Sequence, residues 1–174
     1  MRVRLLGTAA GGGLPQWNCA CDGCARAAGV NRTQDCVAVS GDGRAWFLLN
    51  ASPDLRPQLT AAPELAPGPG RRDTPPRGVL LSTAELDHAL RLLTLREAST
   101  LTQYGSGCML DALAGPFPVR TILAQYTTLH CTTVEPGAAI ELDGACGHTR
   151  WPSVPSGHGT PRAYPATTGC WRTA

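Results

Sequence analysis

Three cysteines stand close together near the N-terminus, with a spacing that is typical of a metal site. Cys19, Cys21 and Cys24 fall within six residues of one another. Zinc in proteins takes four donors in a tetrahedron, and a site built from thiolates is closed and structural rather than catalytic. The spacing therefore predicts a structural zinc ion held by these three thiolates and one further donor.

The sequence leaves the fourth zinc donor open, with Cys36, Asp22 and a histidine as candidates. The alternative is that the three cysteines are free or form disulfides. The N-terminus lacks the long apolar stretch of a secretory signal, so we expect a cytoplasmic location. Reducing conditions there favour metal binding over disulfides for clustered thiols.

A second group of ligating side chains follows a buried strand and opens a helix. It is the run Glu85-Leu-Asp87-His88. Asp87 and His88 could bind a metal, or they could act as a general acid and base. The alternative is a helix N-terminus whose acidic residues stabilise the helix dipole.

Two other motifs have structural explanations. Residues 50–54 resemble a capped helix start, with Ser52 as the expected N-cap, Pro53 in the first turn and Asp54 beside it. The glycines at 11–13 could cradle a phosphate, but the lysine of a Walker motif and the G-x-G-x-x-G pattern are both absent. We therefore do not predict a nucleotide site.

The elements that must position these residues alternate between strands and helices, which predicts an α/β fold. We expect strands at 2–6, 36–40, 45–50, 79–82, 101–104, 129–134 and 139–142. We expect helices at 52–62, 85–98, 109–113 and 119–125. Residues 145–174 are rich in Gly, Pro, Ser and Thr and show no clear periodicity.

Composition bounds the class of protein. The 174 residues are 43% hydrophobic and 16% charged, which suits one globular domain or part of a larger one. A net charge of +2 gives no reason to expect nucleic acid as a partner, and no apolar run is long enough to span a membrane. Lysine is absent, which excludes a lysine nucleophile or Schiff base.

The long motif Leu5-Leu-Gly-Thr-Ala-Ala-Gly-Gly-Gly-Leu-Pro-Gln-Trp-Asn-Cys-Ala-Cys21, followed by Cys24, resembles the start of the PqqB family, coenzyme PQQ synthesis protein B. The resemblance covers about residues 2–144. It continues through further motifs at 31–34, 50–54, 72–75, 80–88, 95–97, 115–118 and 141–144.

This resemblance implies the N-terminal portion of a metallo-β-lactamase-like αββα sandwich. It also implies a role in the bacterial pathway that makes pyrroloquinoline quinone (PQQ) from a peptide carrying glutamate and tyrosine. The expected activity is iron-dependent hydroxylation of the tyrosine-derived precursor, with that precursor and other pathway proteins as partners. A carrier that helps transport PQQ or its precursor to the periplasm, and a metallo-β-lactamase-type hydrolase, are the alternatives.

Carried over to this chain, the resemblance assigns the structural zinc to the three cysteines and a catalytic iron to Asp87 and His88. Glu85 would bind the iron or lie next to it. Thr83 and Glu85 stand where hydrolytic relatives with two zinc ions have histidines, which disfavours a dinuclear site. A single metal with few protein ligands keeps open positions, as oxygen chemistry requires.

The resemblance also divides the chain into a PqqB-like half at residues 1–144 and an irregular tail at 145–174. The tail does not resemble the continuation of the family. We therefore expect a truncated or frameshifted product. Its catalytic site would be incomplete, and the product could lack activity. Half of an αββα sandwich should leave apolar residues exposed on one face of its sheet.

Overall fold

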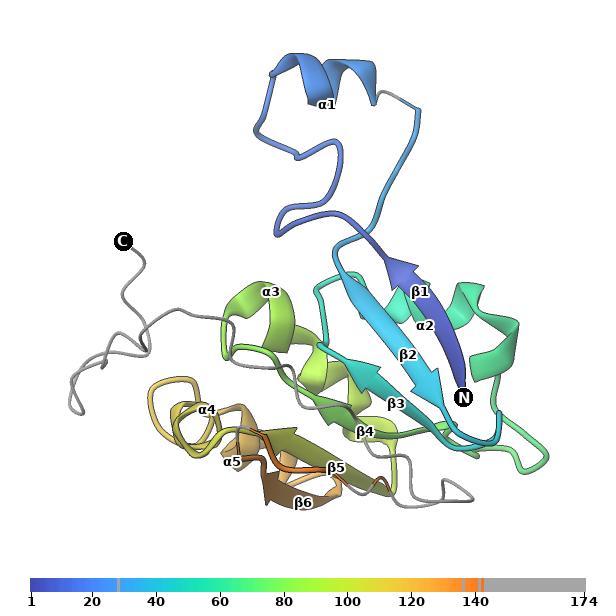
Figure 1. Ribbon diagram of the computed structural model, residues 1–174, viewed down its shortest axis with the longest axis vertical. Helices are drawn as coiled ribbons and strands as arrows, with labels where there is room; N and C mark the ends of the chain where they lie inside the picture. The colour runs from blue at the N-terminus through green and yellow to red at the C-terminus, as the bar shows by residue number, and fades with distance from the viewer. Residues whose placement is uncertain (28, 136, 141, 143–174) are drawn as a thin grey trace.

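The structure is a computed structural model and describes residues 1–27, 29–135, 137–140 and 142. Its centre is a six-stranded sheet in which the strands lie side by side in sequence order (Figure 1). The first three strands form an antiparallel meander, and the third to sixth strands run parallel. The strands are β1 (Arg2–Gly7), β2 (Cys36–Ser40), β3 (Trp46–Leu49), β4 (Pro76–Leu80), β5 (Thr100–Gly105) and β6 (Thr128–Thr133).

Helical segments connect the parallel strands, because a parallel pair needs a crossover rather than a hairpin. The helices are α1 (Asp22–Arg26), α2 (Leu55–Ala61), α3 (Leu86–Ala89), α4 (Gly107–Ala112) and α5 (Val119–Leu123). Two 3₁₀ segments accompany them, η1 (Pro63–Leu65) and η2 (Leu90–Glu97). Figure 1 shows α1 away from the sheet, at the tip of the long loop between β1 and β2.

The main core lies between one face of the sheet and the crossover helices. Side chains alternate across a strand, so Trp46 and Leu48 point to this face while Phe47 points to the other. Leu48 is fully buried, and it shares a cluster with Leu55 of α2 and Leu123 of α5. The same cluster includes Val79, Leu92, Leu101, Leu113 and Val119. This packing confirms the predicted α/β fold.

The opposite face of the sheet carries a smaller core. Phe47 and Tyr104 meet edge to face, with ring centroids 6.2 Å apart, and Leu142 packs against the same cluster. At the β1 edge of this face, Val3 is 55% exposed and Leu5 is 64% exposed. Exposed apolar residues on this face therefore lie at the β1 edge, whereas Val39, Phe47 and Leu80 are buried, so the described part of the face is less open than the sequence led us to expect.

The segment expected as a single helix at 85–98 divides into α3 and the 3₁₀ segment η2. The buried residues explain the difference. Ala89, Leu92, Leu95 and Ala98 are buried at every third position, which is the repeat of a 3₁₀ helix rather than of an α-helix. The strand expected at 139–142 is wrong, because positions 139, 140 and 142 lie outside any strand. Ile140 and Leu142 instead pack on the smaller core.

The expected N-cap of α2 is also wrong. Asp54, not Ser52, occupies the cap position, and no side chain makes a capping hydrogen bond. The Ser52 hydroxyl instead donates to Gln58 Oε1 at 3.1 Å, while Asp54 Oδ2 accepts from the backbone N–H of Gln34 at 2.9 Å. The Asp54 hydrogen bond joins the start of α2 to the segment ahead of β2, whereas the Ser52 hydrogen bond joins the residues before α2 to the helix itself. The short helix α1 within the cysteine loop was not expected from the sequence, and the tail at 145–174 lies outside the described residues.

Candidate metal centres

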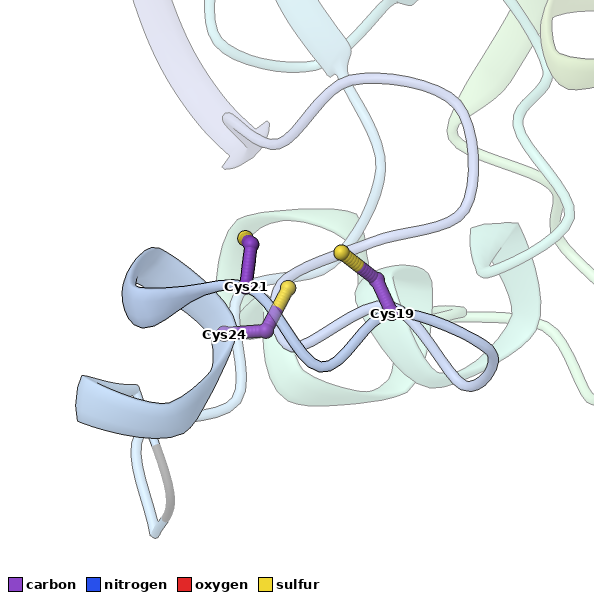
Figure 2. Close-up of side chains that lie close together, drawn as sticks. All are labelled: Cys19, Cys21 and Cys24. Carbon is purple, nitrogen blue, oxygen red and sulfur yellow. The ribbon is translucent and has the colours of Figure 1, made fainter.

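The three N-terminal cysteines form a cluster, here called the cysteine cluster (Cys19, Cys21 and Cys24). Their sulfur atoms lie within 4.8 Å of one another and face a common point (Figure 2). Cys24 is buried in the first turn of α1, whereas Cys21 directly before the helix is exposed. Two thiolates on one tetrahedral zinc lie about 3.8 Å apart, so the cluster needs only a small contraction to hold the ion.

The electrostatics of the cluster favour the thiolate form at Cys21. Hydrogen bonds from the backbone N–H of Cys24, from the thiols of Cys19 and Cys24, and from the backbone N–H of Gly23 lower the pKa of Cys21 to about 7. The thiolate is the form of cysteine that binds metals. Cys21 therefore offers a thiolate to zinc near neutral pH. The backbone N–H of Cys21 lowers the pKa of Cys19, but hydrogen bonds with the side chains of Cys21 and Cys24 outweigh it and raise that pKa.

The candidates for the fourth zinc donor do not join the cluster. Cys36 is buried, its thiol donates to a backbone carbonyl 3.3 Å away, and burial raises its pKa to about 12. Asp22 is exposed and pairs with an arginine, and His130 lies on β6. His148 and His158 lie outside the described residues. Within the described part of the chain, no fourth ligating side chain completes the set.

Alkylation of the metal-free chain should single out Cys21. Its thiolate fraction rises as the pH increases through about 7, so labelling by iodoacetamide should be slow at pH 5 and reach half its maximum rate near pH 7. Cys36 should stay unlabelled, because it is buried with a pKa of about 12. Saturating zinc should protect all three clustered thiols, as read by peptide mass spectrometry. If saturating zinc leaves the labelling rate of Cys21 unchanged, the cysteine cluster is not a zinc site.

The second group lies where the chain leaves β4 and is here called the Asp87–His88 centre. Ligand atoms of Glu85, Asp87 and His88 lie within 4.8 Å of one another. The nearest approach to the imidazole within the group is 3.9 Å, between His88 Nε2 and Asp87 Oδ2. Carboxyl ends of parallel strands are where α/β sheets bind ligands. The sequence thus predicted which residues meet at this edge.

Hydroxyl groups fix the orientation of the imidazole ring. His88 Nδ1 lies 2.8 Å from Thr83 Oγ1 and 3.4 Å from Ser82 Oγ. In the tautomer with the proton on Nδ1, the Nδ1–H group donates to Thr83, and the lone pair of Nε2 points toward the carboxylates. A second-sphere hydrogen bond of this kind is how proteins orient histidines that bind metals.

Sequence reasoning missed Asp35, whose Oδ1 lies 3.2 Å from His88 Nε2. Asp35 stands directly before β2, and β2 runs antiparallel to β3, so Asp35 comes beside Asn50 at the end of β3. The parallel pairing of β3 and β4 then places Asn50 next to the chain leaving β4. The sequence signal was an acidic residue at the start of a strand, and it could be interpreted only once the strand pairing was known.

The glycine-rich loop also meets this centre. A Cβ atom on Gly11 would lie 2.6 Å from Asp87 Oδ2. A loop that lies against a carboxylate is a poor place for a phosphate, which agrees with the absence of a nucleotide motif. The glycine here allows the loop to approach the acid of the centre.

Comparison with known proteins gives the family. The model of the beta-lactamase superfamily domain matches residues 45–172. Coenzyme PQQ synthesis protein B from Bradyrhizobium diazoefficiens is 54% identical over 119 residues, which cover 66% of this chain and 38% of that protein. The protein of the same name from Methylococcus capsulatus is 44% identical over 154 residues, which cover 84% of this chain and 51% of that one.

Solved structures agree with the sequence comparison. The crystal structure of Zn²⁺-bound PqqB from Methylobacterium extorquens has a TM-score of 0.74 and 41% identity, covering 81% of this chain and 52% of that one. A diphosphatase of the PhnP family has a TM-score of 0.63 at 21% identity, covering 80% of this chain and 53% of that one, and shows the fold alone.

The chain spans between 38% and 51% of the length of these two PqqB relatives. No helix in the described residues is long and apolar enough to cross a membrane. The identities and the matching fold confirm the resemblance to coenzyme PQQ synthesis protein B and the predicted fold class. With a family model that matches residues 45–172, this chain belongs to the beta-lactamase superfamily.

Proposed function

We propose that this chain acts in PQQ biosynthesis as a PqqB-type protein, and that its Asp87–His88 centre serves an iron-dependent hydroxylation of the tyrosine-derived precursor. The observation that carries the proposal is the convergence of the His88 imidazole and the Asp87 carboxylate at the end of β4, 3.9 Å apart. The identity to PQQ synthesis proteins supports the pathway.

The choice of oxygen chemistry over hydrolysis rests on the residues around the pair. Thr83 and Glu85 replace the two histidines that a dinuclear hydrolytic site would use, and Thr83 lies against the imidazole of His88 instead. A metal ion held by one imidazole and few carboxylates keeps open coordination positions. Iron needs such positions to bind and activate O₂. When bound, iron would activate O₂, with one oxygen atom added to the aromatic ring and the other leaving as water at the expense of an external two-electron reductant.

The residues of the chain have separate roles in this proposal. Asp87 and His88 would hold the iron, and Glu85, which is exposed beside them, would bind the iron or an incoming water. Thr83 Oγ1 would accept a hydrogen bond from Nδ1–H of His88 and so keep Nε2 turned to the metal. The precursor, a peptide or dipeptide containing glutamate and tyrosine, and other proteins of the pathway are the proposed partners.

We further propose that the cysteine cluster holds a structural zinc. The PqqB of known structure is described as Zn²⁺-bound. In this chain the cluster lies in the same loop as Gly11, whose backbone lies against Asp87. Zinc would therefore hold the end of the loop whose beginning shapes the Asp87–His88 centre.

Two further proposals concern the chain as a whole. We propose that it is a cytoplasmic protein and that residues 1–144 form its PqqB-like part.

The experiment is anaerobic reconstitution with zinc and Fe²⁺, followed by oxygen, ascorbate and a Glu-Tyr dipeptide. We expect an oxygen-dependent product that gains one oxygen atom, detected by mass spectrometry, and no product from Asp87→Asn. The full-length PqqB from Methylobacterium extorquens, whose crystal structure is compared above, is run in parallel as the control with the complete family sequence. The hydroxylase proposal is wrong if neither iron-loaded protein forms a hydroxylated product and one of two other activities is found instead. These are ester hydrolysis by a zinc-loaded protein, or binding of PQQ without turnover.

A further inference from the structure

We infer that Asp35 is a further ligand of the Asp87–His88 centre, supplying one carboxylate oxygen from the segment ahead of β2. The inference rests on the proposed function only in that the centre binds a divalent metal. It adds a donor from a different part of the chain, 53 residues away from His88. Nothing in the sequence motif around Asp87 indicates this residue.

The two distances to His88 Nε2 fit a shared metal ion. Two donors that are each about 2.1 Å from an ion lie about 3.0 Å apart at a right angle and about 4.2 Å apart when opposite. Asp35 Oδ1 lies 3.2 Å from His88 Nε2, and Asp87 Oδ2 lies 3.9 Å from the same nitrogen. Both separations from His88 Nε2 fall within that span. Asp35 is not part of the group formed by Glu85, Asp87 and His88, whose ligand atoms already lie within 4.8 Å of one another, so its carboxylate would have to draw closer to that group around the ion.

The charges would favour a bound cation in the tautomer of His88 that carries its proton on Nδ1. Two carboxylates approach Nε2, while Nδ1 faces the hydroxyl groups of Ser82 and Thr83. With the proton on Nδ1, the lone pair of Nε2 faces two negative groups, which is unfavourable unless a positive ion lies among them. A divalent metal satisfies the imidazole and both acids at once.

Asn50 holds Asp35 in place, so it is a positioning residue. Its Nδ2 group donates to Asp35 Oδ2 at 3.2 Å, which leaves Oδ1 to face the imidazole. Asn50 Oδ1 accepts from the backbone N–H of Ser82 at 3.0 Å and from its hydroxyl at 2.9 Å. Asn50 is buried and adopts φ 66°, the left-handed region that asparagine tolerates better than most residues. The fold thus holds Asn50 in a strained backbone conformation at the position where its amide orients the Asp35 carboxylate.

Asp35 could instead orient His88 by accepting a hydrogen bond from Nε2–H. In that case Nε2 would not bind the metal, and Asp35 would not contact it. The two roles differ in the number of water molecules on the bound ion. Losing a ligand opens a coordination position that water fills, whereas losing an orienting hydrogen bond leaves the count of bound waters unchanged.

The test uses the full chain, with zinc first bound at the cysteine cluster, and titrates it with Mn²⁺. Carboxylate and imidazole ligands accept Mn²⁺, and thiolates do not favour it. The electron paramagnetic resonance signal of free Mn²⁺ gives the affinity, and the relaxation rate of water protons reports bound waters. We expect Asp35→Asn to weaken Mn²⁺ binding about tenfold or more and to add one bound water. Asp111→Asn, on the exposed side of α4, is the matched control and should change neither value.

Asn50→Gly tests the positioning role, since glycine accepts the left-handed backbone and removes only the amide. It should weaken Mn²⁺ binding less than Asp35→Asn does, with no added water. Circular dichroism and thermal melting verify that each variant is folded. Asp35→Asn with unchanged affinity, or with weaker binding and no added water, overturns the inference while leaving the metal centre intact. Wild-type binding no tighter than that of Asp87→Asn would overturn the proposed function as well.

Discussion

Replacing Gly11 with alanine is expected to weaken metal binding at the Asp87–His88 centre about tenfold or more, with a change of less than about 1 kcal/mol in the free energy of unfolding. The added methyl would lie 2.6 Å from Asp87 Oδ2, the same oxygen that faces His88 Nε2. Gly11 itself is exposed and its backbone suits alanine, so the carboxylate moves and the fold does not. Mn²⁺ titration and thermal melting measure the two quantities.

Gly107→Ala is the matched control for this prediction. Gly107 begins α4, and a Cβ atom there would have no neighbour within 4 Å. Alanine also favours helix over glycine, so this variant should keep full metal affinity and be equally or slightly more stable. If Gly11→Ala binds Mn²⁺ as tightly as Gly107→Ala does, the loop does not position Asp87.

The largest loss of stability is expected from Gln58→Ala, at about 3 kcal/mol, or roughly 10 °C in melting temperature. Gln58 is buried in α2, and its Nε2 group donates to Gln34 O at 2.7 Å and to Thr33 Oγ1 at 3.0 Å. Its Oε1 accepts from the Ser52 hydroxyl at 3.1 Å. Alanine removes the hydrogen bonds that Gln58 makes to the carbonyl of Gln34 and to the buried Ser52 hydroxyl, and it opens a cavity beside them.

Chemical denaturation followed by circular dichroism measures this loss. Gln125→Ala is the matched control, because Gln125 is exposed just after α5 and its truncation should change stability by less than about 0.5 kcal/mol. Equal stability of the two variants would show that the buried amide does not hold the segment ahead of β2. Since this segment carries Asp35, Gln58→Ala should also weaken Mn²⁺ binding.

Local patterns were enough to predict most of the elements. Alternation predicted β1, and a Ser-Pro-Asp start predicted α2. The strands expected at 36–40 and 45–50 and the helices expected at 109–113 and 119–125 also lie within a few residues of the observed β2, β3, α4 and α5. The predictions that failed depended on tertiary packing. Ile140 and Leu142 are apolar because they pack on the smaller core and not because they pair with a strand. Ser52 serves a buried network with Gln58 instead of capping its helix.

The sequence by itself determined the ligand types and their local grouping, because three thiols within six residues, or an acid beside a histidine, are neighbours in any fold. Only the tertiary structure decided what else meets them. Asp35 reaches His88 because β2 pairs antiparallel with β3 while β3 pairs parallel with β4, and Gly11 reaches Asp87 because the loop from β1 returns to that edge. Such contacts depend on strand pairing across distant parts of the chain, and hydrophobic burial of the whole sheet, not local sequence, selects that pairing.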